Sequence, residues 1–297
     1  MRLIVLLLIC FAGAANAQVP FTLKKLEASK DFKAVYSAQI TELYSVMQPP
    51  DTAAAKMTTT STLEISQEVL ERKKNYFQSD CIVSSFCRSD SLTRPGRRPD
   101  TASNQKCQMI KLILQYDRQG NYAGPTVELR TNSIGISRDI LCFYNTSKQL
   151  VYRLPGAANS TAWKTEETDT LKYVGFELIH KYPLEWTVKE RLDTMGLKCV
   201  KLVYVSGPAP YYGVESGMKA LGLETIHSGT AEVSGVIVLE EKTGRLVSKH
   251  ETGEFKGAMN IKSPASETIS PDYFSYSKSI SLKSLTRTKR KKFLGIF

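Results

Sequence analysis

Two short segments carry the residue types of a serine enzyme that forms an acyl intermediate. Ser216 and Lys219 have S-x-x-K spacing, and Lys242-Thr243-Gly244 matches K-T-G. In such enzymes the two motifs lie much farther apart and an S-x-N element stands between them, which is missing here. The K-T-G also falls in a turn pattern instead of a strand. We therefore assign no catalytic role to either segment.

The three histidines offer no clearer reaction centre. His180 shares the alternation of an apolar run, which predicts a hydrogen-bonded core residue, and His227 and His250 lie in polar stretches with no evident Ser, Cys or Asp partner. No C-x-x-C pair exists and the histidines lie far apart, so we predict neither a metal site nor a cofactor. The pattern favours a non-enzymatic protein, and a secreted hydrolase that uses His180 is kept as an alternative.

Two aromatic residues are the best binding candidates. Tyr211 and Tyr212 follow a strand-like run and lie within Gly207-Pro208-Ala209-Pro210-Tyr211-Tyr212-Gly213. Tyrosines on a stiff Pro/Gly loop can stack on a sugar or pack against a protein at low entropic cost. The alternative is that both rings cover the edge of the core. Tyr211 and Tyr212 are the predicted ligand-binding residues.

The first seventeen residues have the composition of a secretory signal peptide. Arg2 precedes an apolar run from residue 3 to 11, and small residues follow up to Ala17. The run is too short to span a bilayer, which needs about 20 residues. We expect cleavage after Ala17 and a mature protein that is secreted or periplasmic, at the cell envelope.

An oxidising compartment makes the cysteines candidates for a disulfide. After cleavage the chain keeps Cys81, Cys87, Cys107, Cys142 and Cys199. Cys87 and Cys107 flank the polar segment 88–106, so a bridge from Cys107 to Cys87 or Cys81 would close that loop. Such a bridge stabilises by about 3 kcal/mol. Cys142 and Cys199 lie in apolar runs and are expected to be reduced and buried.

Most of the excess positive charge lies near the C-terminus. The formal net charge is +11, and seven Lys and Arg residues fall between Lys278 and Lys292. Residues 286–297 read as a basic, flexible tail that could rest on an anionic surface. Because the remaining charge is small and the protein is expected outside the cytoplasm, we predict no nucleic-acid partner.

Alternation of apolar and polar residues dominates the chain. Ile110, Leu112 and Leu114 form one such series, and Leu184, Trp186 and Val188 form another. Three segments with an acid at the first position and glycine at the fourth lie between such runs: Asp117–Gly120, Asp193–Gly196 and Glu241–Gly244. They predict hairpins with type I turns followed by a bulge. The expected fold is mainly β, an antiparallel sandwich or a strongly curved sheet.

Helical signals are confined to two short stretches, 52–57 and 214–221. No linker and no internal repeat divides the chain. We predict a single β-rich domain over residues 18–285, with one or two short helices and with 88–106 as an inserted polar loop.

A resemblance covers residues 150–260. Leu154-Pro155-Gly156 through Trp163, the hairpin around Gly196, and Gly235–Leu239 followed by Thr243–Val247 occur in this order. The order resembles that of uncharacterised secreted β-rich proteins of Bacteroidota-type bacteria. The resemblance implies a mostly-β fold in the cell envelope and brings no activity or site residues.

Together these observations predict a secreted, non-enzymatic binding protein or an envelope-associated protein. Its partner would be a protein, a glycan or a lipid. Within this class, a carrier that holds an apolar ligand or lipid in a curved sheet is the alternative.

Overall fold

The structure is a computed structural model, and it describes residues 32–46, 55–72, 76–94, 96–106, 110–117, 122–126, 146–150, 161–173, 176–215 and 222–287. The strands are β1 (Phe32–Val46), β2 (Ala55–Arg72), β3 (Tyr76–Thr93), β4 (Asp100–Lys106), β5 (Ile110–Asp117), β6 (Tyr122–Thr126), β7 (Ala162–Tyr173), β8 (Phe176–Thr194), β9 (Leu197–Glu215), β10 (Glu224–Glu240), β11 (Leu246–Lys262) and β12 (Glu267–Arg287). A short 3-10 helix, η1 (Lys148–Leu150), lies between β6 and β7. The predicted signal peptide lies outside the described residues.

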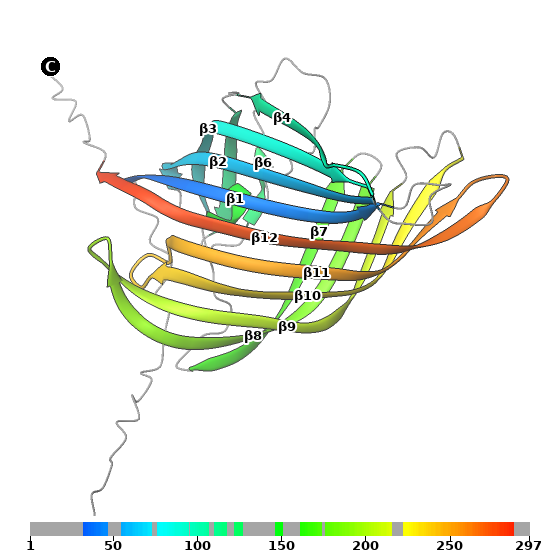
Figure 1. The fold of residues 1–297 in the computed structure, drawn as a ribbon. Coiled ribbons are helices and arrows are strands. Elements are labelled where there is room, and N and C mark those ends of the chain that lie inside the picture. Colours follow the sequence, from blue (N-terminus) through cyan, green and yellow to red (C-terminus); the bar gives the residue numbers. More distant parts are fainter. Residues whose placement is uncertain are drawn as a thin grey trace, which may run out of the picture.

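The described strands form one 12-stranded antiparallel sheet that curves strongly (Figure 1). Its order is β6-β5-β3-β2-β1-β12-β11-β10-β9-β8-β7, and β4 pairs with β3 beside this path. The first and last strands are neighbours, since β1 pairs with both β2 and β12. The predicted mainly-β, antiparallel, strongly curved sheet is confirmed, and it takes the curved-sheet form.

Alternation produces strands with one covered face. In β8, Leu184, Trp186 and Val188 are buried, whereas Glu185 and Lys189 are exposed. The two sides of each strand therefore meet different environments, as a sheet covered on one face requires.

The hairpin turns differ in type. The pairs β5–β6, β8–β9 and β10–β11 are hairpins, as predicted. Met195 and Gly196 both have positive φ, 55° and 72°, between the paired residues Thr194 and Leu197. This is a two-residue type I′ turn, so the predicted type I turn with a bulge is wrong there. At the β10–β11 turn Gly244 has the expected left-handed φ of 68°.

Three local predictions need correction. Most of the segment 88–106 is strand instead of loop: β3 continues to Thr93, and β4 pairs with β3 from Leu92 to Phe86. Polar residues suffice there because the backbone ladder supplies the pairing. Residues 55–57 of the first helix candidate belong to β2, and Val214 of the second belongs to β9. The sheet also extends two residues beyond the predicted domain end, to Arg287 of β12.

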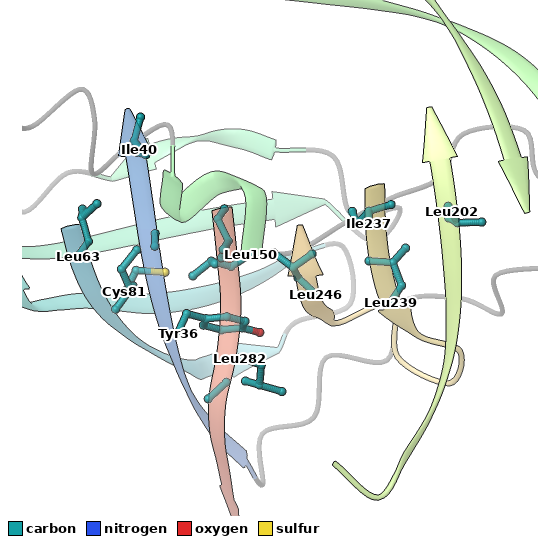
Figure 2. Close-up of a cluster of buried hydrophobic side chains, with 14 of the residues drawn as sticks. Tyr36, Ile40, Leu63, Cys81, Leu150, Leu202, Ile237, Leu239, Leu246 and Leu282 are labelled. Carbon is teal, nitrogen blue, oxygen red and sulfur yellow. The ribbon is translucent and has the colours of Figure 1, made fainter. Parts of the chain in front are cut away.

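The core lies on the inner face of the sheet. Figure 2 shows Leu150 of η1 between Tyr36 and Cys81 on one side and Leu246 and Ile237 on the other. Strands from both halves of the sheet thus pack through η1, which covers the inner face near the β8–β9 and β10–β11 turns. We call this the closed end. The opposite end, near the β11–β12 turn, is called the open end.

Candidate functional site on the inner face of the sheet

Register identifies the side chains that share the inner face, because residues opposite each other in a ladder point to the same side. Phe255 of β11 pairs with Ala231 of β10 and with Phe274 of β12. Phe274 pairs in turn with Tyr44 of β1. All four face the same side as the core. These side chains therefore form a continuous line across the strands.

This line is apolar and lies towards the open end. We call it the apolar row, and it contains Tyr211, Phe255, Phe274, Tyr44, Met57 and Leu92. Ring centroids are 4.1 Å apart for Tyr211 and Phe255 and 4.8 Å apart for Tyr44 and Phe274. Phe255 is buried beneath this stack, whereas the side chains from Phe274 to Leu92 are only half-buried. The row thus presents aromatic and aliphatic surface that the described chain covers in part.

Two glycines allow two tyrosine rings to pack closely against the backbone of the sheet. A Cβ at Gly253 would overlap the Tyr276 ring, and a Cβ at Gly235 would overlap the Tyr204 hydroxyl. The missing side chains let both rings lie flat on β10 and β11. Their hydroxyls then reach the carboxylate of Glu251.

Glu251 is the centre of a buried hydrogen-bond network. Tyr204 Oη donates to Glu251 Oε2 at 2.6 Å, and Tyr276 Oη donates to Oε1 at 3.2 Å. Lys249 Nζ lies 2.7 Å from Oε2. Burial by itself would raise the pKa of Glu251, but Lys249, the nearby Lys278 and the hydrogen bonds outweigh it and lower the pKa to about 2. The carboxylate is therefore ionised inside the protein.

Polar side chains continue from this network across β12, β1, β2 and β3. Thr59 Oγ1 donates to Asp90 Oδ1 at 2.7 Å, and Arg88 Nε lies 3.0 Å from the same carboxylate. We call the whole set the polar belt: Tyr204, Lys249, Glu251, Tyr276, Lys278, Glu42, Thr59, Ser61, Arg88 and Asp90. It holds three cationic and three carboxylate side chains, so its formal charges cancel.

The polar belt separates the apolar row from the closed end. Lys249 Nζ donates to Gln149 Oε1 of η1 at 3.2 Å, which joins the polar belt to the helix that covers the core. Beyond it lie fully buried side chains such as Leu202, Ile237 and Leu246. The inner face therefore has a packed, buried end and a partly exposed end.

The predicted site residues Tyr211 and Tyr212 lie in β9 and not on a loop. A bulge opposite Ala231 and Val233 shifts the alternation of β9, so Tyr211 faces the inner side and Tyr212 the outer side, 49% exposed. The structure therefore separates the two rings, and they cannot contact one small ligand together.

Sequence reasoning missed the partner of His227. Its Nδ1 lies 2.6 Å from Asp272 Oδ2, so β10 is joined to β12 across β11. Gly257 of β11 pairs with both Gly229 and Asp272 and has no side chain to separate the pair. No sequence signal links residues 45 positions apart. The side chain of His180 lies outside the described part.

Three cysteines are described, and all are free thiols in the structure: Cys81, Cys87 and Cys199. Burial raises the pKa of Cys81 to about 12 and that of Cys199 to about 11, which makes both thiols unreactive. Cys199 is buried, as predicted. Cys107 and Cys142 lie outside the described residues, so the bridge from Cys107 to Cys87 or Cys81 stays a prediction.

In the part of the chain that the structure describes, no His, Cys, Asp and Glu side chains gather in threes that could hold a metal ion. No described helix is long and apolar enough to cross a membrane.

The fold and the site define a class: a large, open, curved antiparallel sheet with an apolar inner face. No protein-family model matches the sequence, and no curated protein matches it. Among solved structures the chain is similar to lipovitellin, from a study of lipid–protein interactions in that protein. The TM-score is 0.50 at 10% sequence identity, over 88% of this chain and 26% of the lipovitellin chain. At this identity the likeness concerns the fold, and the chain spans about a quarter of lipovitellin.

Proposed function

We propose that this protein is a secreted, non-enzymatic binding protein that carries an apolar ligand or lipid on the apolar row. One observation carries the proposal: aromatic side chains on four strands form a continuous line on the inner face of a curved sheet, and all of them except the buried Phe255 are partly exposed. Contiguous exposed apolar surface of this kind is a binding feature in soluble proteins. The fold likeness to lipovitellin, whose lipid interactions were studied, gives further support.

Both tryptophans of the chain can report on such a ligand. Trp163 and Trp186 stack with ring centroids 5.9 Å apart on the inner face, and Trp186 lies 4.7 Å from Tyr204 of the polar belt. Titration with a fatty acid brominated on its chain should quench their fluorescence. A bromide salt at the same concentration should not quench the fluorescence, and a soluble oligosaccharide should not displace the fatty acid. Displacement by the oligosaccharide would favour a glycan partner instead.

Tyr211 and Tyr212 provide a matched pair of variants. Tyr211→Ala removes a ring from the apolar row, and we expect about tenfold weaker binding of the brominated fatty acid. Tyr212→Ala removes the same atoms from the outer face and should leave binding within about twofold. Equal effects of the two changes would contradict the proposed site. Urea unfolding of both variants separates lost binding from lost stability.

Secretion is part of the proposal. Residues 1–17 carry the predicted signal peptide, and the proposed location is secreted or periplasmic, at the cell envelope. N-terminal sequencing of protein recovered outside the cytoplasm should begin at Gln18. Recovery of the intact Met1 form from that fraction would contradict cleavage.

The basic C-terminus adds a proposed contact with an anionic surface. Because β12 ends at Arg287, deletion of residues 288–297 leaves the strand intact. The deletion should weaken binding to vesicles that contain anionic lipid and leave the melting temperature unchanged. Unchanged vesicle binding would exclude this role.

A hydrolase is the second candidate, because the carboxylate of Asp272 contacts Nδ1 of His227 in the way that the acid of a catalytic triad orients its histidine. If His227 is catalytic, His227→Gln abolishes hydrolysis of chromogenic esters by the purified protein. Absence of turnover by the wild type would exclude this candidate for that substrate class.

A further inference from the structure

We infer that the apolar row takes a single flexible acyl chain that lies across the strands, an inference that rests on the proposed function and names its ligand class. The length, the width, the curvature and the charge of the site each bear on it.

The apolar row has the length of a long chain. It runs from Tyr211 on β9 to Leu92 on β3, through the neighbouring strands β10, β11, β12, β1 and β2. Neighbouring strands lie about 4.8 Å apart, so this path measures about 29 Å. An elongated ligand can therefore remain in contact with apolar side chains along its whole length.

The apolar row is also narrow. On β12 the apolar Phe274 lies between Tyr276 of the polar belt and Asp272, each about 7 Å away along the strand. Towards the closed end, Glu42, Thr59 and Asp90 border the row on the next three strands. Towards the open end, the contact between His227 and Asp272 crosses Gly257. A second chain or a wide ring system would cover these polar groups and desolvate them.

The curvature of the sheet and the cancelled charges of the polar belt also favour a single flexible chain as the ligand. Because the sheet curves across its strands, as Figure 1 shows, the apolar row is an arc, and a flexible chain can follow an arc that a rigid ring system cannot. The formal charges of the polar belt cancel, and its central carboxylate is already paired with Lys249. The row therefore offers apolar contact without requiring a charge on the part of the ligand that lies along it.

The test is a length series read by competition with the brominated fatty acid. For saturated acids and their methyl esters from about 8 to about 26 carbons, each added methylene should raise affinity up to about fourfold until the chain fills the row, after which affinity should level off. A sterol and a two-chain phospholipid should bind at least about tenfold more weakly than the best single chain. Equal affinity for the sterol, or affinity independent of chain length, would overturn the inference while leaving the proposed function standing.

Adjacent residues on opposite faces of β2 supply the matched variants. Met57→Glu places a charge within the apolar row, and it should move the levelling-off to shorter chains without weakening the shortest ones. Thr58→Glu places the same charge on the outer face and should change nothing. If Met57→Glu weakened all chain lengths equally, the length assignment would be wrong. If Met57→Glu failed to fold, the wild-type length series would still decide. If no probe bound the wild type, the proposed function and this inference would fall together.

Discussion

The two ends of the inner face use the same strands and the same alternation, yet only one end is closed. Leu239 and Leu246 at the closed end are fully buried, whereas Tyr44 and Met57 at the open end are half-buried. The difference comes from η1, whose Leu150 fills the space above the closed end. Among the described residues, nothing equivalent packs on the open end. Within the described part of the chain, η1 is thus the element that covers one end of the inner face.

The largest expected effect is the loss of stability that follows truncation of a core side chain at the closed end. Leu239→Ala should lower the free energy of unfolding by about 4 kcal/mol, because it leaves a cavity in a packed region. Met57→Ala at the open end should cost only about 1 kcal/mol, since its side chain already meets solvent. Urea denaturation with an unchanged m-value measures both. Equal costs would show that the open end is packed as tightly as the closed end.

The boundary between the two ends should be sensitive to acid. The pKa of Glu251 is lowered from 4.5 to about 2, so its contribution is fully present above pH 4.5 and is lost as the pH falls towards 2. The shift corresponds to about 3 kcal/mol. Glu251→Gln should remove this part of the acid dependence in urea melts between those pH values. Glu232→Gln, on the exposed side of the neighbouring strand β10, is the control and should leave the dependence nearly unchanged.

A smaller loss of stability is expected from a substitution at Gly253, against which the Tyr276 ring packs. Gly253→Ala should destabilise by about 2 kcal/mol and weaken ligand binding, because the added methyl group lifts the ring out of the polar belt towards the apolar row. Gly207→Ala is the control, since a Cβ there meets no atom within 4 Å. Thermal melts and the brominated-chain titration report the two effects. If Gly253→Ala changed neither stability nor binding, the position of the Tyr276 ring would not depend on this glycine.

The smallest effect lies at the turn of the closed end. Met195 has a φ of 55° in a type I′ turn, a conformation that asparagine tolerates better. Met195→Asn should stabilise by about 0.5 kcal/mol, and ligand affinity should not change because the turn is far from the apolar row. A loss of stability in the thermal melt would contradict the turn assignment.

Most of the fold could be predicted because its determinants are local. Alternation in β8 and acid-to-glycine turns between apolar runs require only neighbouring residues, and both led to the observed antiparallel hairpins. The segment 88–106 was misjudged because it has no apolar face. The segment forms strands because β3 continues past Phe86 and pairs with β4. The local pattern of Ser, Arg and Asp residues does not reveal this pairing.

The candidate site could be predicted only in part. Tyr211 was identified by type, but its face depends on the bulge in β9: Leu202 and Tyr204 face inwards at even positions, and Tyr211 faces inwards at an odd one. An uninterrupted alternation would have turned Tyr212 inwards instead. The partner of His227 and the network around Glu251 also went unrecognised, because each joins strands that only the register brings together.

The sequence by itself determined that this chain forms antiparallel strands with one apolar face, because alternation with a period of two and turn chemistry act over a few residues. The tertiary structure decided how those strands curve into one sheet, which tyrosine faces inwards, and where η1 closes the core. These outcomes depend on contacts between residues far apart in the chain: Lys249 with Gln149, Tyr204 with Glu251, and His227 with Asp272. Such contacts exist only once the register is set, and they lie between a packed core and a partly exposed apolar surface.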